Sequence, residues 1–283
     1  MKENYLKDKI AIITGAAGGI GREIAKLFDI YDTKLILTDI NEEGLRVIAK
    51  ELSQEPLIIP CDITKIEQVK NLISQTNSKY GTVDILINTV GIIIPALFEN
   101  TNYSDIEKQI NVNLLGIIHC TKEVIPIMKD VGGGNIVTIS SLAGIVPETY
   151  SSIYTATKFA LRGFDLTLNL ELKKHNITVS TIFPDSVDTP MLEYEAKHGG
   201  SPLTFLSDPV KTEKVAKAVL KAILKNKVEI CVPHFQGTLS KFIMCFPKRV
   251  QKMWPKLEKK GEKRKQEFLR NLDLQFNREK NFN

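Results

Sequence analysis

Apolar positions along this chain form two different patterns. Short, continuous runs of aliphatic residues recur, as at residues 85–87 (Ile-Leu-Ile) and 136–139 (Ile-Val-Thr-Ile), and such runs are typical of parallel strands that are buried on both faces. Between these runs, apolar residues recur with the helical period. The pattern predicts strands near Ile10, Lys34, Leu57, Ile85, Ile136, Thr178 and Val228, with a helix after each of the first six.

This alternation predicts an α/β fold of three layers, in which a doubly wound, parallel sheet of seven strands lies between two layers of helices. The chain has 283 residues, of which 43% are hydrophobic and 25% charged, and it is long enough to bury one large core. We expect one domain over residues 1–237. A basic, amphipathic helical extension over residues 238–283 follows it and is not an independent domain.

A glycine-rich turn follows the first predicted strand. Residues 14–21 read Thr-Gly-Ala-Ala-Gly-Gly-Ile-Gly, and an amphipathic helix runs on from Arg22 through Phe28. Gly15 allows a tight turn, Gly19 lets the backbone approach a ligand, and Gly21 lets the helix pack closely. Free N–H groups and the helix dipole at this end attract an anion. The segment therefore predicts a site for the pyrophosphate of a dinucleotide.

A carboxylate ends the second predicted strand. Asp39 lies twenty-four residues after Gly15, where it can accept hydrogen bonds from the 2′-OH of a ribose. It would repel the 2′-phosphate of NADP, and neither Gly18 nor Ile40 supplies a basic partner for that phosphate. We therefore expect NAD as the cofactor, with NADP disfavoured. The alternative is that Asp39 only caps the helix predicted over residues 41–52.

A second group of polar residues carries acid/base chemistry. Tyr154 and Lys158 stand at i and i+4 of a helix predicted through Asn169, so their side chains share a face. A free phenol titrates near ~10, and an adjacent ammonium group is expected to pull its pKa toward the working range. Ser141 ends a strand thirteen residues before Tyr154, and it can bond a substrate oxygen. Alternatively, Ser141 is only a helix cap.

Together these residues resemble the short-chain dehydrogenase/reductase family. The resemblance covers roughly residues 8 to 235, and its pattern is Thr14-Gly15-x-x-x-Gly19-x-Gly21, Asp62, Asn113, Ser141 and Tyr154-x-x-x-Lys158. It implies that residues 1–237 are a Rossmann-type catalytic domain that binds NAD(P) and oxidises a hydroxyl group or reduces a carbonyl group.

The resemblance also implies a role for each site residue. Tyr154 would be the general acid/base, Lys158 would bind the nicotinamide ribose and tune Tyr154, Ser141 would hold the substrate oxygen, and Asn113 would fix a water molecule in a proton relay. The implied cofactor-binding residues are Gly15, Gly19, Ile20, Gly21, Asp39, Asp62, Ile63, Asn88, Gly91, Tyr154, Lys158, Pro184, Val187 and Thr189.

The chain departs from the family pattern in two places. Where relatives usually have Asn-Asn-Ala-Gly after the fourth strand, this chain has Asn88-Thr89-Val90-Gly91. After the sixth strand, the usual Pro-Gly is Pro184-Asp185 here. Because Asp185 brings a carboxylate near the nicotinamide, we expect the substrate preference or the path of this loop to differ from the family norm.

The C-terminal extension is basic. From Lys241 onward thirteen Lys and Arg face five Asp and Glu, a net charge of +8, whereas the whole chain has +5, which leaves about −3 for the remainder. Between Leu239 and Leu257 the apolar residues have a helical period, and Pro247 and Pro255 are expected to break the segment into short helices.

Three explanations of this extension stay open. It packs on its own domain or a partner subunit as a lid, it lies on an anionic membrane surface, or it binds nucleic acid, the least favoured of the three because no recognition fold accompanies the charge. The segment from Val232 to Leu257 also loosely resembles the C-terminal extension of the retinol and 17β-hydroxysteroid dehydrogenase subgroup, which acts on lipids. Those relatives generally add an N-terminal hydrophobic anchor, and the chain has none before its first strand.

The expected substrate is an alcohol or carbonyl compound. Apolar residues within the variable loop at residues 185–212 favour a lipid-, retinoid- or steroid-like molecule. The alternatives are a small polar hydroxy compound, or a binding protein that senses NAD(H) without turnover. A homodimer or homotetramer is expected.

The remaining composition predicts a cytoplasmic protein, with peripheral contact at a membrane surface as the other possibility. Cysteines 61, 120, 231 and 245 are scattered, so we expect no disulfide, as in a reducing compartment. The four histidines lack the spacing of metal ligands, and no metal is expected. No apolar run reaches eighteen residues.

Overall fold

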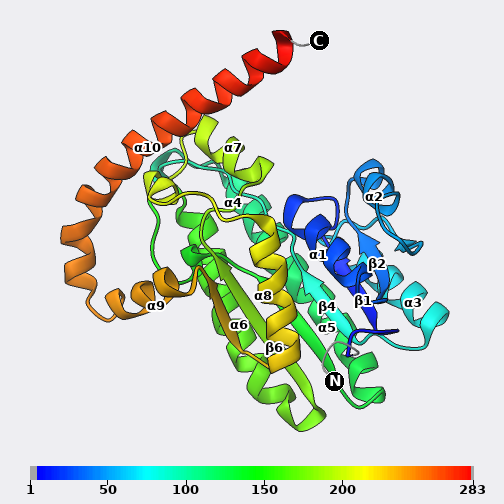
Figure 1. Ribbon diagram of the computed structural model, residues 1–283. Coiled ribbons are helices and arrows are strands. Elements are labelled where there is room, and N and C mark those ends of the chain that lie inside the picture. Colours follow the sequence, from blue (N-terminus) through cyan, green and yellow to red (C-terminus); the bar gives the residue numbers. More distant parts are fainter. Residues whose placement is uncertain (1–4, 282–283) are drawn as a thin grey trace.

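The computed structural model of the protein describes residues 5–281, with side chains through residue 274. Figure 1 shows a central sheet with helices on both sides. The strands are β1 (Ile10–Thr14), β2 (Lys34–Thr38), β3 (Leu57–Ile58), β4 (Ile85–Asn88), β5 (Gly134–Ile139), β6 (Ile177–Pro184) and β7 (Glu229–Val232). The helices are α1 (Gly19–Asp29), α2 (Glu42–Ala49), α3 (Ile66–Tyr80), α4 (Tyr103–Ile110), α5 (Gly116–Asp130), α6 (Ser152–Leu172), α7 (Pro190–Lys197), α8 (Thr212–Lys225), α9 (His234–Ile243) and α10 (Pro247–Asn281).

Five short helical turns complete the description. They are η1 (Phe98–Asn100), η2 (Asn111–Leu115), η3 (Leu142–Gly144), η4 (Lys173–His175) and η5 (Pro202–Phe205). Four are 3₁₀ turns, and η2 is a π-helical turn. The predicted α/β architecture with a seven-stranded parallel sheet is confirmed.

The seven strands form one sheet in the order β3-β2-β1-β4-β5-β6-β7, and every adjacent pair is parallel. The order reverses between β1 and β4, because the chain moves outward in one direction through β2 and β3 and then returns to the other side of β1. In open parallel sheets, ligands bind beyond the carboxyl ends of the strands at such a reversal.

Alternate strand residues bury two separate cores. Ile13 points to the face covered by α1, α2 and α8, while Ile12 points to the face covered by α3, α5 and α6. All five residues of β1 are buried, as expected for a strand between two helical layers. In Figure 1, α8 crosses in front of the sheet.

The C-terminal extension differs from its prediction in one respect. Pro247 separates α9 from α10, and it is the first residue of α10, where a missing N–H costs nothing. The predicted break at Pro255 is wrong, because α10 continues through this residue. Proline inside a helix removes one hydrogen bond, but later turns of α10 pack on η5 and α7 and hold the helix beyond it. Residue 237, the predicted end of the catalytic domain, lies inside α9.

In the part of the chain that the structure describes, no helix combines the length and the apolarity that crossing a membrane requires.

Candidate active site

The turn after β1 requires its glycines. Gly15 has a φ of 70°, in the left-handed region that favours glycine, and a Cβ there would lie 2.7 Å from the hydroxyl oxygen of Thr89. A Cβ on Gly21 would collide with the carbonyl oxygen of Gly15. The Thr89 hydroxyl also donates a hydrogen bond to the carbonyl of Thr14 (2.6 Å), so this departure from the family pattern ties the end of β4 to the turn.

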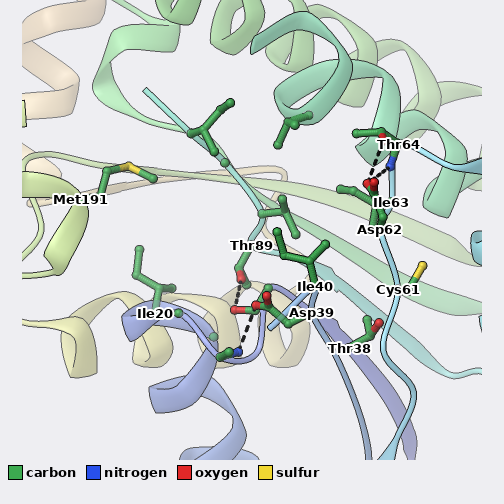
Figure 2. Close-up of a pocket in the computed structure, with 18 of the residues that line it drawn as sticks. Ile20, Thr38, Asp39, Ile40, Cys61, Asp62, Ile63, Thr64, Thr89 and Met191 are labelled. Atoms are coloured by element: carbon green, nitrogen blue, oxygen red, sulfur yellow. Dashed lines mark hydrogen bonds between the residues drawn. The ribbon is translucent and has the colours of Figure 1, made fainter. Parts of the chain in front are cut away.

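Asp39 is fixed by the backbone on both sides of it. Its carboxylate accepts hydrogen bonds from the N–H of Ala17 (3.2 Å), within the glycine-rich turn, and from the N–H of Asn41 (3.0 Å). The cap of α2 is Asn41, whose side chain accepts a bond from the N–H of Gly44 (3.0 Å). The alternative that Asp39 only caps this helix is therefore wrong. Asp39 is one of the residues that line the cavity in Figure 2.

A cavity of about 850 Å³ lies over this end of the sheet. In Figure 2, Ile20 and Met191 lie on one side of it, and Asp62 and Thr64 on the other. Asp62 accepts hydrogen bonds from the N–H and the hydroxyl of Thr64 (2.9 and 2.7 Å). The predicted cofactor-binding residues that line it are Gly15, Gly19, Ile20, Gly21, Asp39, Asp62, Ile63, Gly91 and Thr189. The glycine cradle, the carboxylate at the end of β2 and the volume together fit a dinucleotide.

A second cavity of about 110 Å³ holds three of the four predicted catalytic residues, Ser141, Tyr154 and Lys158. It is also lined by Pro184 and Val187, predicted on the nicotinamide side. The two cavities share Ile20, Thr89, Gly91, Thr189 and Met191 in their linings. A ligand in the large cavity can therefore reach the catalytic residues in the small one.

Two predicted residues line neither cavity. Asn113 is fully buried within the π-helical turn η2, a feature that frequently marks functional sites. Its side-chain amide makes two hydrogen bonds with the backbone of Ile92: it accepts one from the N–H and donates one to the carbonyl, both at 2.8 Å. Asn88 is also fully buried, and its amide donates to the hydroxyl of Thr121 (3.2 Å). Both residues hold the chain beyond β4. Their predicted roles in the relay and in cofactor binding stay predictions.

Lys158 is buried beside the phenol. Its ammonium donates a hydrogen bond to the carbonyl of Ile139 (3.2 Å) and lies 5.4 Å from the centre of the Tyr154 ring. Burial lowers the pKa of Lys158 to about 8, and Asp165 acts in the opposite direction. Asp165 is itself buried on α6 and accepts a bond from the hydroxyl of Thr181 (2.8 Å). Burial raises the pKa of Asp165 to about 7.

The pKa of Tyr154 is raised, which is opposite to the expected direction. Burial is the largest cause, the carboxyl groups of Glu148 and Glu195 add to it, and a hydrogen bond with Ser141 acts against it. The Ser141 hydroxyl also accepts a bond from the N–H of Ala143 (3.1 Å), so this residue both caps η3 and reaches the phenol. Burial, reinforced by two acidic neighbours, therefore outweighs the lowering that was expected from Lys158.

Glu148 and Glu195 were missed by the sequence reasoning, and they line the small cavity together with Asp185. The sequence pattern did contain a signal for Glu195. This residue lies three positions after Leu192 and directly before Ala196, and therefore on the apolar face of α7. Glu148 had no such signal, because it lies in a loop. Burial raises the pKa of Glu195 to about 7, and it also raises the pKa of Asp185 and of Glu148.

Helix α10 holds the two segments that carry these glutamates. The indole N–H of Trp254 donates to the carbonyl of Pro147 (3.0 Å), and the hydroxyl of Thr149 donates to Glu258 (2.7 Å). Farther along α10, the buried ammonium of Lys265 donates to the carbonyl of Gly200 (2.7 Å). The extension therefore packs on its own domain beside the small cavity, as the first of the three explanations predicts, and Figure 1 shows α10 passing α7.

Among residues 5–274, no three acidic, histidine or cysteine side chains come close enough together to hold a metal ion. All four cysteines have free thiols, three of them buried.

Comparisons with known proteins show the family of this chain. A family model described as short chain dehydrogenase matches residues 9–199. An uncharacterized oxidoreductase of Staphylococcus aureus (strain MRSA252) is 32% identical over 228 residues, which cover 78% of this chain and 94% of that protein.

Two solved structures are also similar. A 3-ketoacyl-(acyl-carrier-protein) reductase from Brucella melitensis, complexed with NADH, has a TM-score of 0.71 and 27% identity, covering 77% of this chain and 91% of that one. Levodione reductase has a TM-score of 0.76 over 82% of this chain and 99% of that one, and at 23% identity it shows the fold alone. On the family match and the identity to its relatives, this protein is an oxidoreductase of the short-chain dehydrogenase family.

Proposed function

We propose that this protein transfers a hydride between NAD(H) and a primary or secondary alcohol or the corresponding carbonyl compound, with Tyr154 as the general acid/base. One observation carries the proposal: Ser141, Tyr154 and Lys158 line a single small cavity, which adjoins the cavity that fits a dinucleotide. Proton transfer at a substrate oxygen requires a group that orients the oxygen, a group that gives or takes the proton, and a charge that stabilises the ion that forms. The hydroxyl, the phenol and the ammonium group can supply these three functions.

Each of these residues has a separate task. The Ser141 hydroxyl orients the substrate oxygen by a hydrogen bond, and Tyr154 gives a proton to that oxygen or takes one from it. The Lys158 ammonium stabilises the negative charge that forms on the phenol when its proton leaves. The bound nicotinamide supplies or accepts the hydride. The buried setting strengthens these interactions, because little water competes for the same groups.

We propose NAD rather than NADP as the cofactor. The glycine-rich turn would hold the pyrophosphate, and Asp39 would accept hydrogen bonds from the adenosine ribose. The carboxylate of Asp39 is oriented by two backbone N–H groups, and Ile40 beside it is 76% exposed and supplies no positive charge. A 2′-phosphate in this position would face uncompensated negative charge.

The lining of the small cavity favours the smaller and more polar of the two expected substrate classes. Beside a retinoid- or steroid-like molecule its three carboxyl groups would gain no further hydrogen-bond donor, and burying them against apolar surface would cost free energy. The apolar class drew its support from the loop at residues 185–212. In the structure, Phe205 of that loop is buried in contact with α10, whereas Leu192 packs there and also lines the small cavity.

The wider contacts of the chain also stay proposals. A homodimer or homotetramer is one, and a cytoplasmic location is another. Peripheral contact with an anionic membrane is supported by exposed aromatic residues on α9, where Phe235 and Phe242 are 76% and 63% exposed. We propose no role in nucleic-acid binding.

The test is turnover by the purified protein. With NAD and a panel of short and long alcohols, the wild type should produce NADH. Tyr154→Phe should lose nearly all turnover, by ~10²-fold or more, while its Kd for NAD stays close to the wild-type value. Lys158→Met should impair both. Tyr103→Phe is the control, because Tyr103 is 86% exposed and lines neither cavity. If Tyr154→Phe retains wild-type turnover, the assignment of Tyr154 fails. A protein that binds NAD without turning over any alcohol would be the sensor of the alternative.

A further inference from the structure

Three carboxyl groups gather in the small cavity from separate parts of the chain. Glu148 lies in the loop after β5, Asp185 follows β6, and Glu195 is on α7. They interact with one another, since Glu195 and Asp185 both disfavour ionisation of Glu148. Glu148 and Glu195 also act on the phenol of Tyr154. The cluster therefore faces the reaction centre and is not an isolated feature of the surface.

The three carboxyl groups are held to different degrees. Asp185 accepts a hydrogen bond from the hydroxyl of Ser207 (2.6 Å), and Glu195 accepts one from the hydroxyl of Thr204 (2.7 Å). Glu195 is 6% exposed. Glu148 has no hydrogen bond or ion pair with any side chain that the structure describes. Its hydrogen-bonding capacity is thus open to a ligand in this cavity.

A second polar group points to a ligand independently of the acids. Ser186 lines the same cavity and is 9% exposed, and its hydroxyl oxygen has no hydrogen-bond partner within the described residues. Buried hydroxyl groups in folded proteins nearly always have a partner. A donor or acceptor supplied by a bound molecule would satisfy this one.

The acidic groups of the cavity outnumber its basic groups. Of the described residues that line it, only Lys158 is basic, and its ammonium already bonds the carbonyl of Ile139. Three carboxyl groups thus face one ammonium group. A metal ion does not restore the balance, because these groups do not lie close enough together to share one. A larger cation, which can contact separated carboxylates through several N–H donors, suits their spacing.

We propose that the substrate of this enzyme carries an ammonium group close to its reacting hydroxyl or carbonyl group, as in a small amino alcohol or amino ketone, and that Glu148, with Asp185 and Glu195, binds that ammonium group. This assignment rests on the proposed oxidoreductase function and names its substrate class. The small volume of the cavity, about 110 Å³, restricts the substrate to a short molecule. An ammonium group has three N–H donors, and Ser186 can accept the one that the carboxylates leave.

The proposed ligand would also act on Tyr154. Glu148 and Glu195 raise the pKa of the phenol, and an ammonium group between them and the phenol would offset that effect. A substrate without positive charge would leave the phenol harder to ionise. The expected selectivity therefore extends beyond binding and includes the proton-transfer step.

The experiment uses three small alcohols of similar shape: 1-amino-2-propanol, 2-butanol, in which a methyl group replaces the ammonium group, and 1,2-propanediol. With NAD, wild-type kcat/KM should be about tenfold or more higher for the amino alcohol than for either neutral one. Glu148→Gln should remove about tenfold of that preference, and it should raise kcat/KM for 2-butanol, because one of the two carboxyl groups that raise the pKa of the phenol is removed. Glu195→Gln should shift it in the same direction. Glu193→Gln is the matched control, because Glu193 is on α7 outside the small cavity, with a side chain that is 47% exposed and in an ion pair with Lys197.

A binding measurement separates this proposal from the proposed function. In the presence of saturating NADH, 1-amino-2-propanol should raise the Tm of the wild type and of Tyr154→Phe, but not that of Glu148→Gln. If this result is obtained but no alcohol is turned over, the proposed oxidoreductase function fails and the proposed ammonium site stands. Equal kcat/KM for all three alcohols would overturn the proposal, as would a preference for the diol, which would indicate a hydroxyl-rich substrate. The proposal would also fail if Glu148→Gln weakened the binding of NAD and not that of the amino alcohol. The carboxyl groups would then interact with the cationic nicotinamide ring.

Discussion

Lys158 and Tyr154 lie side by side in a cavity that excludes most water, and burial acts on the two groups in opposite directions. It lowers the pKa of the ammonium to about 8 and raises the pKa of the phenol. Both effects favour the uncharged form. A charge on a bound molecule can therefore decide whether Tyr154 and Lys158 are ionised. Single substitutions in the lining of the cavity should for the same reason change the activity measurably.

Asp39 offers the most direct test of cofactor choice. Asp39→Ala/Ile40→Arg removes a repulsion and supplies a partner for the 2′-phosphate, so kcat/KM for NADP relative to NAD should rise by about tenfold or more. The control is Ile30→Arg, which introduces the same charge at an isoleucine that is 75% exposed and lies outside both cavities. A wild-type preference for NADP would contradict the role given to Asp39.

Glu195 should make stability depend on pH. Its pKa rises from 4.5 to about 7 in the folded state, so the folded protein keeps a proton that the unfolded chain has released. The stability from this group is fully present below pH 4.5 and is lost as the pH rises to about 7, by roughly 3 kcal/mol. Glu148 and Asp185 act in the same sense, and Lys265 opposes them.

The measurement is the Tm of the protein without ligands at pH 5 and at pH 7.5. The wild type should lose more Tm between these values than Glu195→Gln, which has no proton to release. Glu193→Gln, exposed on the same helix, should follow the wild type. Equal losses in wild type and Glu195→Gln would show that Glu195 ionises freely in the folded protein.

What the sequence could reveal of the site depended on distance along the chain. Gly15, Asp39, Tyr154 and Lys158 were found because strand, turn and helix periods place them relative to close neighbours. Of the acidic lining, Asp185 was expected near the nicotinamide, but Glu148 was not found, because its loop is held by contacts with a segment more than a hundred residues away. The rise in the pKa of Tyr154, which burial causes first and Glu148 and Glu195 increase, depends on the same tertiary packing.

At the level of elements, the strands were predicted well because a parallel strand buried on both faces must be apolar throughout. The helical extension was predicted less well. Proline was expected to end the helix at residue 255, but the cost of one lost hydrogen bond is local, while the packing of later turns on η5 is tertiary. Sequence periodicity does not report that packing. The π-helical turn at Asn113 had no sequence signal that we recognise.

Gly261 tests the packing of α10 on η5. A Cβ at this position would collide with the carbonyl oxygen of Pro202, so Gly261→Ala should destabilise the protein by about 1–3 kcal/mol. It should also lower kcat/KM, since α10 holds the loops of the small cavity, and leave the Kd for NAD unchanged. Gly163→Ala is the control, because its Cβ would meet nothing within 4 Å. An unchanged Tm for Gly261→Ala would mean that α10 does not pack as described.

For the molecule as a whole, the charged and apolar surfaces meet at the C-terminal extension. Phe235, Leu239 and Phe242 are exposed, and their spacing of four and three residues places them on one face of α9. Exposed lysine and arginine residues follow at the start of α10, at positions 248, 249 and 252. An apolar face with a basic border is typical of a surface that contacts anionic lipid.

Vesicle co-sedimentation tests this contact. The full chain should pellet with anionic vesicles at low salt and less at high salt. Phe235→Ser/Phe242→Ser should lose most of this binding while turnover of short alcohols persists, because neither residue lines a cavity. If the wild type does not pellet and the double variant is smaller by sedimentation velocity, the face belongs to a subunit contact instead.

The contacts made by α10 also have a consequence for the order of events during synthesis. Every residue that lines the dinucleotide cavity lies before position 192, whereas the loop that carries Glu148 is fastened by Trp254 and Glu258. A chain leaves the ribosome from its N-terminus onward. A nascent chain should therefore gain the elements of its cofactor site well before its substrate loops are fastened, and those loops wait for the last fifth of the protein.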